Sequence, residues 1–101
     1  MAADYLEAIT RKDFRKTYYY AEKGNKHAQY SLAKIYEVGT VAAEKNLVLA
    51  YYLYSLAFEK GIKSAKEKLD HLALIMTKAQ LDKATARLNK YKIMSGIQKL
   101  L

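Results

Sequence analysis

The chain has 101 residues, a length typical of one small domain with a modest core. Hydrophobic residues make up 51% of it, and the absence of proline together with only four glycines favours helix over sheet. No apolar run reaches the roughly 18 residues of a membrane span, and the absence of cysteine excludes disulfides and cysteine-ligated metals.

The net charge of +8 is distributed unevenly along the chain. Residues 1–50 hold eight Lys or Arg against six Asp or Glu, whereas residues 51–101 hold ten against four. Such a charge permits an acidic partner, nucleic acid or anionic lipid. Lysine-rich helix faces that are simply solvated are the plainer interpretation.

The first half of the chain predicts three helical segments. Residues 4–9 form a short opening segment, and residues 14–23 form a second one that ends at Gly24. The third covers residues 25–38 and ends at Gly39, after which a short loop follows. Glycine at these positions supplies the left-handed backbone conformation that ends a helix.

The second half predicts three more segments. Residues 46–60 form a helix that ends at Gly61, residues 63–76 form the next, and residues 77–101 form the last. The predicted fold is therefore all-α, with about six helices in a single domain over residues 1–101.

Capping residues and apolar stripes support these segments. Asn25 and Asn46 can cap the helices that follow them, and Thr77 with Gln80 has the spacing of a capping box. The predicted stripe of the fifth segment is Ala65, Leu69, Leu72, Ala73 and Met76. That of the last segment is Leu81, Ala84, Leu88 and Tyr91.

Two segments of the chain match at an offset of 37 residues. Residues 21–32 and residues 58–69 share Glu-Lys-Gly, then Ala four residues later, then Leu four residues beyond that. A period of roughly 35–40 residues in a helix-forming chain indicates stacked helical hairpins. Each hairpin buries its apolar face only against its neighbours, which leaves an extended surface suited to binding another molecule.

The residues from Ala21 to Gly39, Ala-Glu-Lys-Gly-Asn-x-x-Ala-Gln-Tyr-x-Leu-Ala-x-x-Tyr-x-x-Gly, and those from Asn46 to Gly61 resemble the Sel1-like repeat. This family is related to the tetratricopeptide repeat. The resemblance implies a stack of antiparallel helical hairpins, that is, a short α-solenoid with a right-handed superhelix. It also implies a bacterial origin.

The resemblance divides the chain into four parts. One complete repeat covers residues 24–61, and residues 1–23 resemble the helices of a partial repeat before it. Residues 62–76 resemble a degenerate repeat helix, and residues 77–101 resemble a C-terminal capping helix.

Catalytic, metal and cofactor sites are not expected. The two histidines, His27 and His71, are 44 residues apart, and no acidic residue or cysteine stands at a ligand-like spacing to either. The chain has no Ser-His-Asp arrangement and no phosphate-binding glycine loop. We therefore do not expect an enzyme.

The resemblance also implies where a partner binds, because the first helix of each hairpin lines the concave side of a tetratricopeptide-like stack. The partner-binding residues that it implies are His27, Tyr30, Lys34, Glu37, Val38, Ser64, Glu67 and His71. Leu74 and Ile75 follow on the same side. A groove of mixed polar, aromatic and apolar character suits a peptide or a partner helix.

Tyrosine is abundant, with ten residues in a chain without tryptophan, and most of them should supply core volume. Consecutive residues on a helix cannot all face inward, however. We therefore expect one or two of Tyr18, Tyr19 and Tyr51 to be exposed.

Together these observations predict a protein–protein interaction module or adaptor that is a monomer or a weak homodimer. Roles implied by the resemblance include regulators, host-interaction factors and immunity proteins that neutralise a toxin. The alternative is a basic helical nucleic-acid-binding protein, although the basic residues of residues 77–101 are spread around the helix. A third interpretation is a short cap or fragment whose groove is unused.

The N-terminus has neither a basic start nor an apolar stretch. We therefore expect a cytoplasmic protein as the sequence is written. A removed leader replaced by Met1 would leave the same pattern, and the protein would then be periplasmic or secreted.

Overall fold

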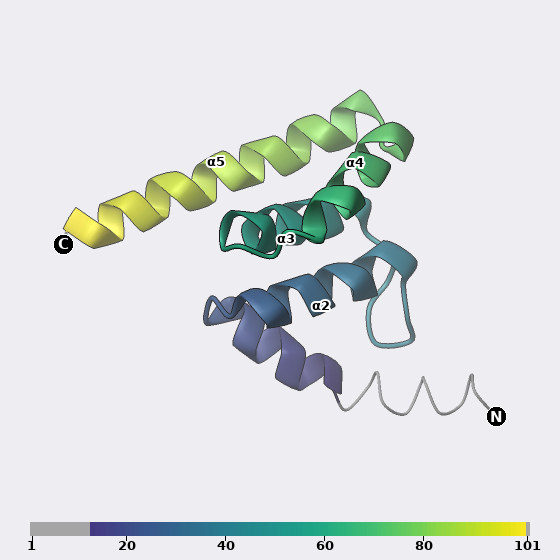
Figure 1. The fold of residues 1–101 in the computed structure, drawn as a ribbon, viewed down its shortest axis with the longest axis horizontal. Coiled ribbons are helices and arrows are strands. Elements are labelled where there is room, and N and C mark those ends of the chain that lie inside the picture. Colours follow the sequence, from purple (N-terminus) through teal and green to yellow (C-terminus); the bar gives the residue numbers. More distant parts are fainter. Residues whose placement is uncertain (1–12, 101) are drawn as a thin grey trace.

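The fold consists of helices joined by short connections (Figure 1). A computed structural model describes residues 13–100, which form a helix over residues 13–22 followed by α2 (Lys26–Val38), α3 (Leu47–Glu59), α4 (Ala65–Ile75) and α5 (Lys78–Leu100). No strand occurs among these described residues, so the predicted all-α class is confirmed. The segment predicted over residues 4–9 lies outside the described residues.

Side-chain caps begin three of the helices where the sequence predicts them. The side-chain oxygens of Asn25 and Asn46 each accept a hydrogen bond from the backbone N–H three residues later, at 2.9 and 3.0 Å. At the start of α5, the N–H of Gln80 donates to Thr77 Oγ1 at 3.1 Å, and the N–H of Thr77 donates to Gln80 Oε1 at 2.9 Å. These bonds satisfy N–H groups that have no partner within the helix.

The predicted helix ends are confirmed as well. Gly24, Gly39 and Gly61 all have positive φ angles, of 93°, 78° and 105°. Each follows a helix and allows the chain to turn into the next one.

Helix α3 lies at the centre of the fold. Its sequence is apolar on nearly every side, and such a helix is stable only when other elements cover it. Helices α2, α4 and α5 all pack on it. Its buried residues are Ala50, Leu53, Tyr54, Ser55, Leu56 and Ala57.

Successive helices reverse direction from residue 13 to the end of α3. The Phe14 ring lies 6.4 Å from the ring of Tyr36, so the beginning of helix 13–22 meets the end of α2. The N–H of Asn46 donates to the carbonyl of Tyr36 at 2.8 Å, beside the start of α3. At the other end of α3, Lys60 Nζ donates to the carbonyl of Gly24 at 2.7 Å, beside the start of α2.

Helices α4 and α5 diverge, although a tight turn joins them. Both pack extensively on α3, but within the described chain they make few contacts with each other. Helix α5 runs in the same direction as α3, since Arg87 lies against Tyr52 and Lys92 Nζ lies 2.8 Å from Glu59 Oε1. A regular hairpin stack with a right-handed superhelix therefore stays a prediction.

The apolar stripes agree with prediction on α5 and only partly on α4. On α5, Ala84 is fully buried, and the other predicted stripe residues, Leu81, Leu88 and Tyr91, are half-buried against the core. On α4, the residues that face the core are Ala65, Leu69, Leu72 and Met76. Ala73 was predicted to face the core, but it is exposed. Ala73 directly follows the fully buried Leu72 and lies about 100° around the helix from it, at the edge of the core-facing side.

The C-terminal part of α5 extends past the other helices (Figure 1). From Ile93 onward no described residue is buried. The apolar side chains exposed there are Ile93, Met94, Ile97 and Leu100. These last two turns therefore contribute little to the core.

Candidate functional site

The predicted partner-binding residues of α2 divide into exposed and supporting side chains. His27, Lys34 and Val38 are exposed. Tyr30 and Glu37 are half-buried because both contact Tyr54 of α3: the two tyrosine rings lie 5.4 Å apart edge to face, and the Tyr54 hydroxyl donates to Glu37 Oε1 at 2.6 Å. Two of the five residues on α2 thus help to hold α2 against α3.

Lys34 and Tyr30 form a pair on the surface of α2. The Lys34 ammonium lies 5.0 Å from the centroid of the Tyr30 ring, one helical turn away. Because Tyr54 holds the ring and Lys34 is exposed, the pair presents an ammonium in a fixed place to any approaching carboxylate or carbonyl.

The predicted residues on or just before α4 are all accessible. Ser64, Glu67 and His71 are exposed, and the next two apolar residues on that side, Leu74 and Ile75, are 86% and 52% exposed. Leu74 and Ile75 are consecutive, so they place two apolar side chains next to each other at the end of α4.

Helices α2 and α4 both lie against α3, but they are not in extensive contact with each other. Both pack on α3, and each runs opposite to it, α2 joined by the loop of residues 39–46 and α4 by residues 60–64 (Figure 1). Their C-terminal ends therefore lie toward the same end of α3, which places Val38, 71% exposed, and Leu74 there as well.

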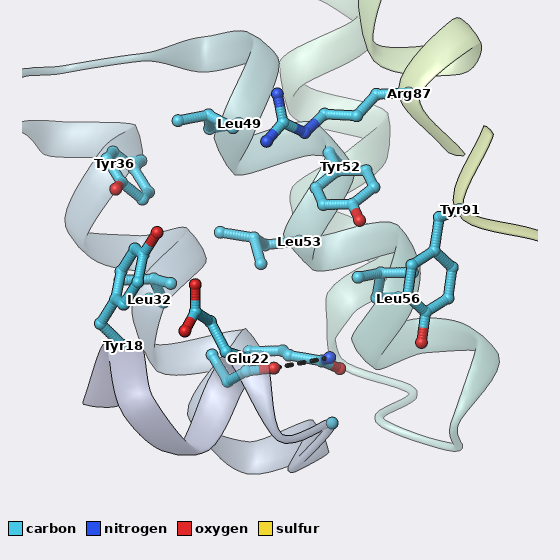
Figure 2. Close-up of a pocket in the computed structure, with 13 residues that line it drawn as sticks. Tyr18, Glu22, Leu32, Tyr36, Leu49, Tyr52, Leu53, Leu56, Arg87 and Tyr91 are labelled. Carbon is cyan, nitrogen blue, oxygen red and sulfur yellow. Dashed lines mark hydrogen bonds between the residues drawn. The ribbon is translucent and has the colours of Figure 1, made fainter. Parts of the chain in front are cut away.

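A hollow that was not predicted lies between helix 13–22, α2, α3 and α5. It has a volume of about 250 Å³, and none of the eight predicted residues lines it. Its floor is formed mainly by Leu49, Leu53 and Leu56 of α3, and its walls are helix 13–22 with α2 on one side and α5 on the other. Figure 2 shows Tyr18 and Glu22 on the first wall, across from Arg87 and Tyr91 on the second.

Charged and aromatic groups face each other across this cavity. The guanidinium of Arg87 lies 5.1 Å from the centroid of the Tyr52 ring, whose other neighbour is Tyr91 at 6.3 Å. Glu22, as a hydrogen-bond acceptor and a negative charge, raises the pKa of Tyr18. Burial raises the pKa of Tyr52 as well.

A weak signal for this cavity exists in the sequence. Tyr18 and Tyr19 are exposed, 41% and 54%, and Tyr51 is half-buried, which confirms that one or two of these three reach the surface. The sequence did not show that Tyr18 faces Arg87, because residues nearly 70 positions apart meet there only through the packing of α5 on α3.

The basic residues of α5 differ in their contacts. Lys92 pairs with Glu59 and Arg87 lies on Tyr52, while Lys78, Lys83 and Lys90 are exposed. Over residues 13–100, no group of three or more histidine or acidic residues is placed to hold a metal ion. No helix in this part of the chain is both long and apolar enough to cross a membrane.

Comparison of the chain with protein-family models, with curated proteins and with solved structures found no match.

Proposed function

We propose that the chain is a helical protein-interaction module of the Sel1-like repeat type, which holds a peptide or helix of a partner protein on α2 and α4. The observation that carries this proposal is the exposure of Val38, Leu74 and Ile75 on the two helices that the sequence singles out for binding. Burying a side chain of this kind at an interface stabilises a complex by about 1.5–3 kcal/mol.

The surroundings of these apolar residues suit recognition of a protein. The Lys34–Tyr30 pair combines an aromatic ring with a cation, and Glu67 adds a negative charge on α4. Tyrosine is among the residues that most often dominate binding energies at protein interfaces, and charged side chains are typical of the rim around them.

The internal repeat gives the proposal its second support. Gly24 and Gly61 occupy equivalent positions in the two matching segments, and each turns the chain with a positive φ between two packed helices. Ala28 and Ala65, the next equivalent pair, both contact the core. A unit of helix, glycine turn and helix thus occurs twice, as expected of a repeat module.

A capture experiment with the full chain tests the proposal. The wild type and the double variant Val38→Asp with Leu74→Asp are immobilised, and proteins retained from native lysate are identified by mass spectrometry. Both changes are at exposed positions, so helicity by circular dichroism should stay the same. We expect one or more proteins retained by the wild type to be lost with the double variant.

The matched control is Lys83→Ser with Lys90→Ser on α5, which alters two exposed lysines on a helix that is not part of the α2 and α4 surface. The proposal would be contradicted if the partner proteins still bind the Asp double variant but no longer bind this control variant. If the retained material is nucleic acid and its binding weakens steeply with salt, the nucleic-acid alternative is correct instead.

A further inference from the structure

The cavity between helix 13–22 and α5 has the size of a receptor for one side chain. Its volume of about 250 Å³ lies below the roughly 300–1,000 Å³ of pockets that enclose small-molecule ligands. It is open at the surface and has a leucine floor, so a large apolar side chain inserted from outside would lose its contact with water.

The charged residues of the cavity favour an occupant that carries both a positive and a negative charge. Glu22 and Arg87 stand on opposite walls, and neither forms an ion pair within the described residues, where the pairs are Lys66–Asp70 and Lys92–Glu59. A purely cationic ligand would meet Arg87, and a purely anionic one would meet Glu22. Only an amphoteric occupant matches both walls.

The aromatic lining points to a protein segment as the source. Tyr18, Tyr36, Tyr52 and Tyr91 line the cavity together with Arg87, and Tyr and Arg are enriched among residues that dominate protein binding. A second copy of this chain is a poor occupant, because two chains of charge +8 repel each other.

We propose that this cavity receives one large apolar side chain of a partner protein, with a basic residue of the partner beside Glu22 and an acidic residue beside Arg87. The inference depends on the proposed function only in taking a protein segment as the ligand. None of the predicted partner-binding residues of α2 and α4 lines the cavity, so each proposal can fail without the other.

Three blocked tripeptides serve as probes: acetyl-Lys-Trp-Glu-amide, acetyl-Lys-Trp-Lys-amide and acetyl-Glu-Trp-Glu-amide. Binding to the full-length ¹⁵N-labelled chain is followed by NMR titration at about 0.15 M salt, which screens the attraction of the whole basic chain for acidic probes. We expect the Lys-Trp-Glu probe to bind about two- to fivefold more tightly than either other probe, as for exposed ion pairs. Shifts should concentrate at residues that line the cavity, and replacing Trp by Ala in the probe should remove binding.

Charge reversal on each wall makes the test specific. Glu22→Lys should shift the preference to the Glu-Trp-Glu probe, and Arg87→Glu should shift it to the Lys-Trp-Lys probe. Glu44→Lys and Lys99→Glu change the net charge by the same amounts at exposed positions that do not line the cavity, and they should keep the wild-type order. All four positions are exposed, so the variants should fold.

Two results would overturn the proposal. One is an order of probe affinities that Glu22→Lys and Arg87→Glu leave unchanged, or that the control variants change equally. The other is a shift map centred outside the cavity, including one centred on α2 and α4. The lysate capture reports on that second surface separately, so failure of the cavity site would not count against the proposed function.

Discussion

The Tyr54 hydroxyl donates a 2.6 Å hydrogen bond to Glu37 Oε1 and so joins α3 to α2 from within the core. Tyr54 is fully buried, whereas Glu37 is half-buried. Replacing Tyr54 by Phe keeps the ring and removes the donor to a charged acceptor. We expect Tyr54→Phe to lower the free energy of unfolding by about 1–2 kcal/mol, measured by chemical denaturation.

Tyr91→Phe is the matched control for this change. The Tyr91 ring also packs edge to face against another tyrosine, but within the described chain its hydroxyl has no hydrogen-bond partner in the protein. Its removal should change the unfolding free energy by less than about 0.5 kcal/mol. Equal losses for the two variants would show that the bond to Glu37 contributes nothing beyond the hydroxyl itself.

We expect Tyr54 to make the fold less stable at alkaline pH. Burial and the hydrogen-bonded Glu37 carboxylate raise the pKa of Tyr54 well above its ordinary value of 10.0. Above pH 10 the unfolded chain therefore releases this proton while the folded chain retains it, and the free energy of unfolding falls as the pH rises. Tyr18 and Tyr52 act in the same direction because their pKa values are raised as well.

Denaturation curves at pH 8 and pH 10.5 test this prediction on the wild type and Tyr54→Phe. The wild type should lose more stability than the variant over this interval, because the variant lacks the largest of the three contributions. Parallel losses in both proteins would assign the alkaline effect to other groups.

Overpacking tests the position of the small residues between α2 and α3. Ala33 is 0% exposed, so Ala33→Leu should destabilise the fold by about 1–3 kcal/mol. Ala73→Leu makes the same change at an exposed site on α4 and should have an effect near zero. Thermal midpoints measure both variants, and an unchanged midpoint for Ala33→Leu would place that residue outside the interface.

Two truncations separate the parts of α5. Ending the chain after Lys92 keeps the pair with Glu59 and removes only exposed turns, so the melting temperature should change little. Ending it before Thr77 uncovers Leu53 and Leu56 on α3, and the protein should aggregate or lose cooperative unfolding. A monomeric protein that melts cooperatively without residues 77–101 would show that α5 does not cover the core.

Gly39 and Gly61 differ in what surrounds them. Both have positive φ, which costs an alanine about 1–2 kcal/mol. A Cβ at Gly39 would also lie 2.9 Å from the backbone nitrogen of Lys45, whereas nothing lies within 4 Å of one at Gly61. Gly39→Ala should therefore be more destabilising than Gly61→Ala by at least about 1 kcal/mol in chemical denaturation.

Local signals explain how far the fold could be predicted from the sequence. Asn25, Asn46 and the Thr77–Gln80 pair act within one turn of a helix, so their types and spacing are sufficient to locate helix starts. The exposure of Ala73 could not be obtained in this way. It depends on how α4 is oriented against α3, because Ala73 lies at the edge of the core-facing side of α4.

The α2 and α4 surface and the cavity differ, for the same reason, in how far the sequence predicts them. Leu74 and Val38 were placed on the partner side from the repeat register, and their exposure agrees with that placement. The cavity needs Tyr18, Leu53 and Arg87 from three helices to meet, and no periodicity within a helix contains that information. Tyr54 shows a further limit, since its bond to Glu37 gives a residue predicted for binding a structural role.

The central position of α3 has a consequence for how the chain loses its structure. In a regular repeat array each unit contacts only its neighbours, so an end can fray while the rest stays folded. Here α2, α4 and α5 all pack on α3, and α4 and α5 make few contacts with each other. A disturbance that dislodges α3 therefore removes the packing of all three helices at once. The chain should behave as a single cooperative unit, in which the amide hydrogens of α3 exchange with solvent only through global unfolding.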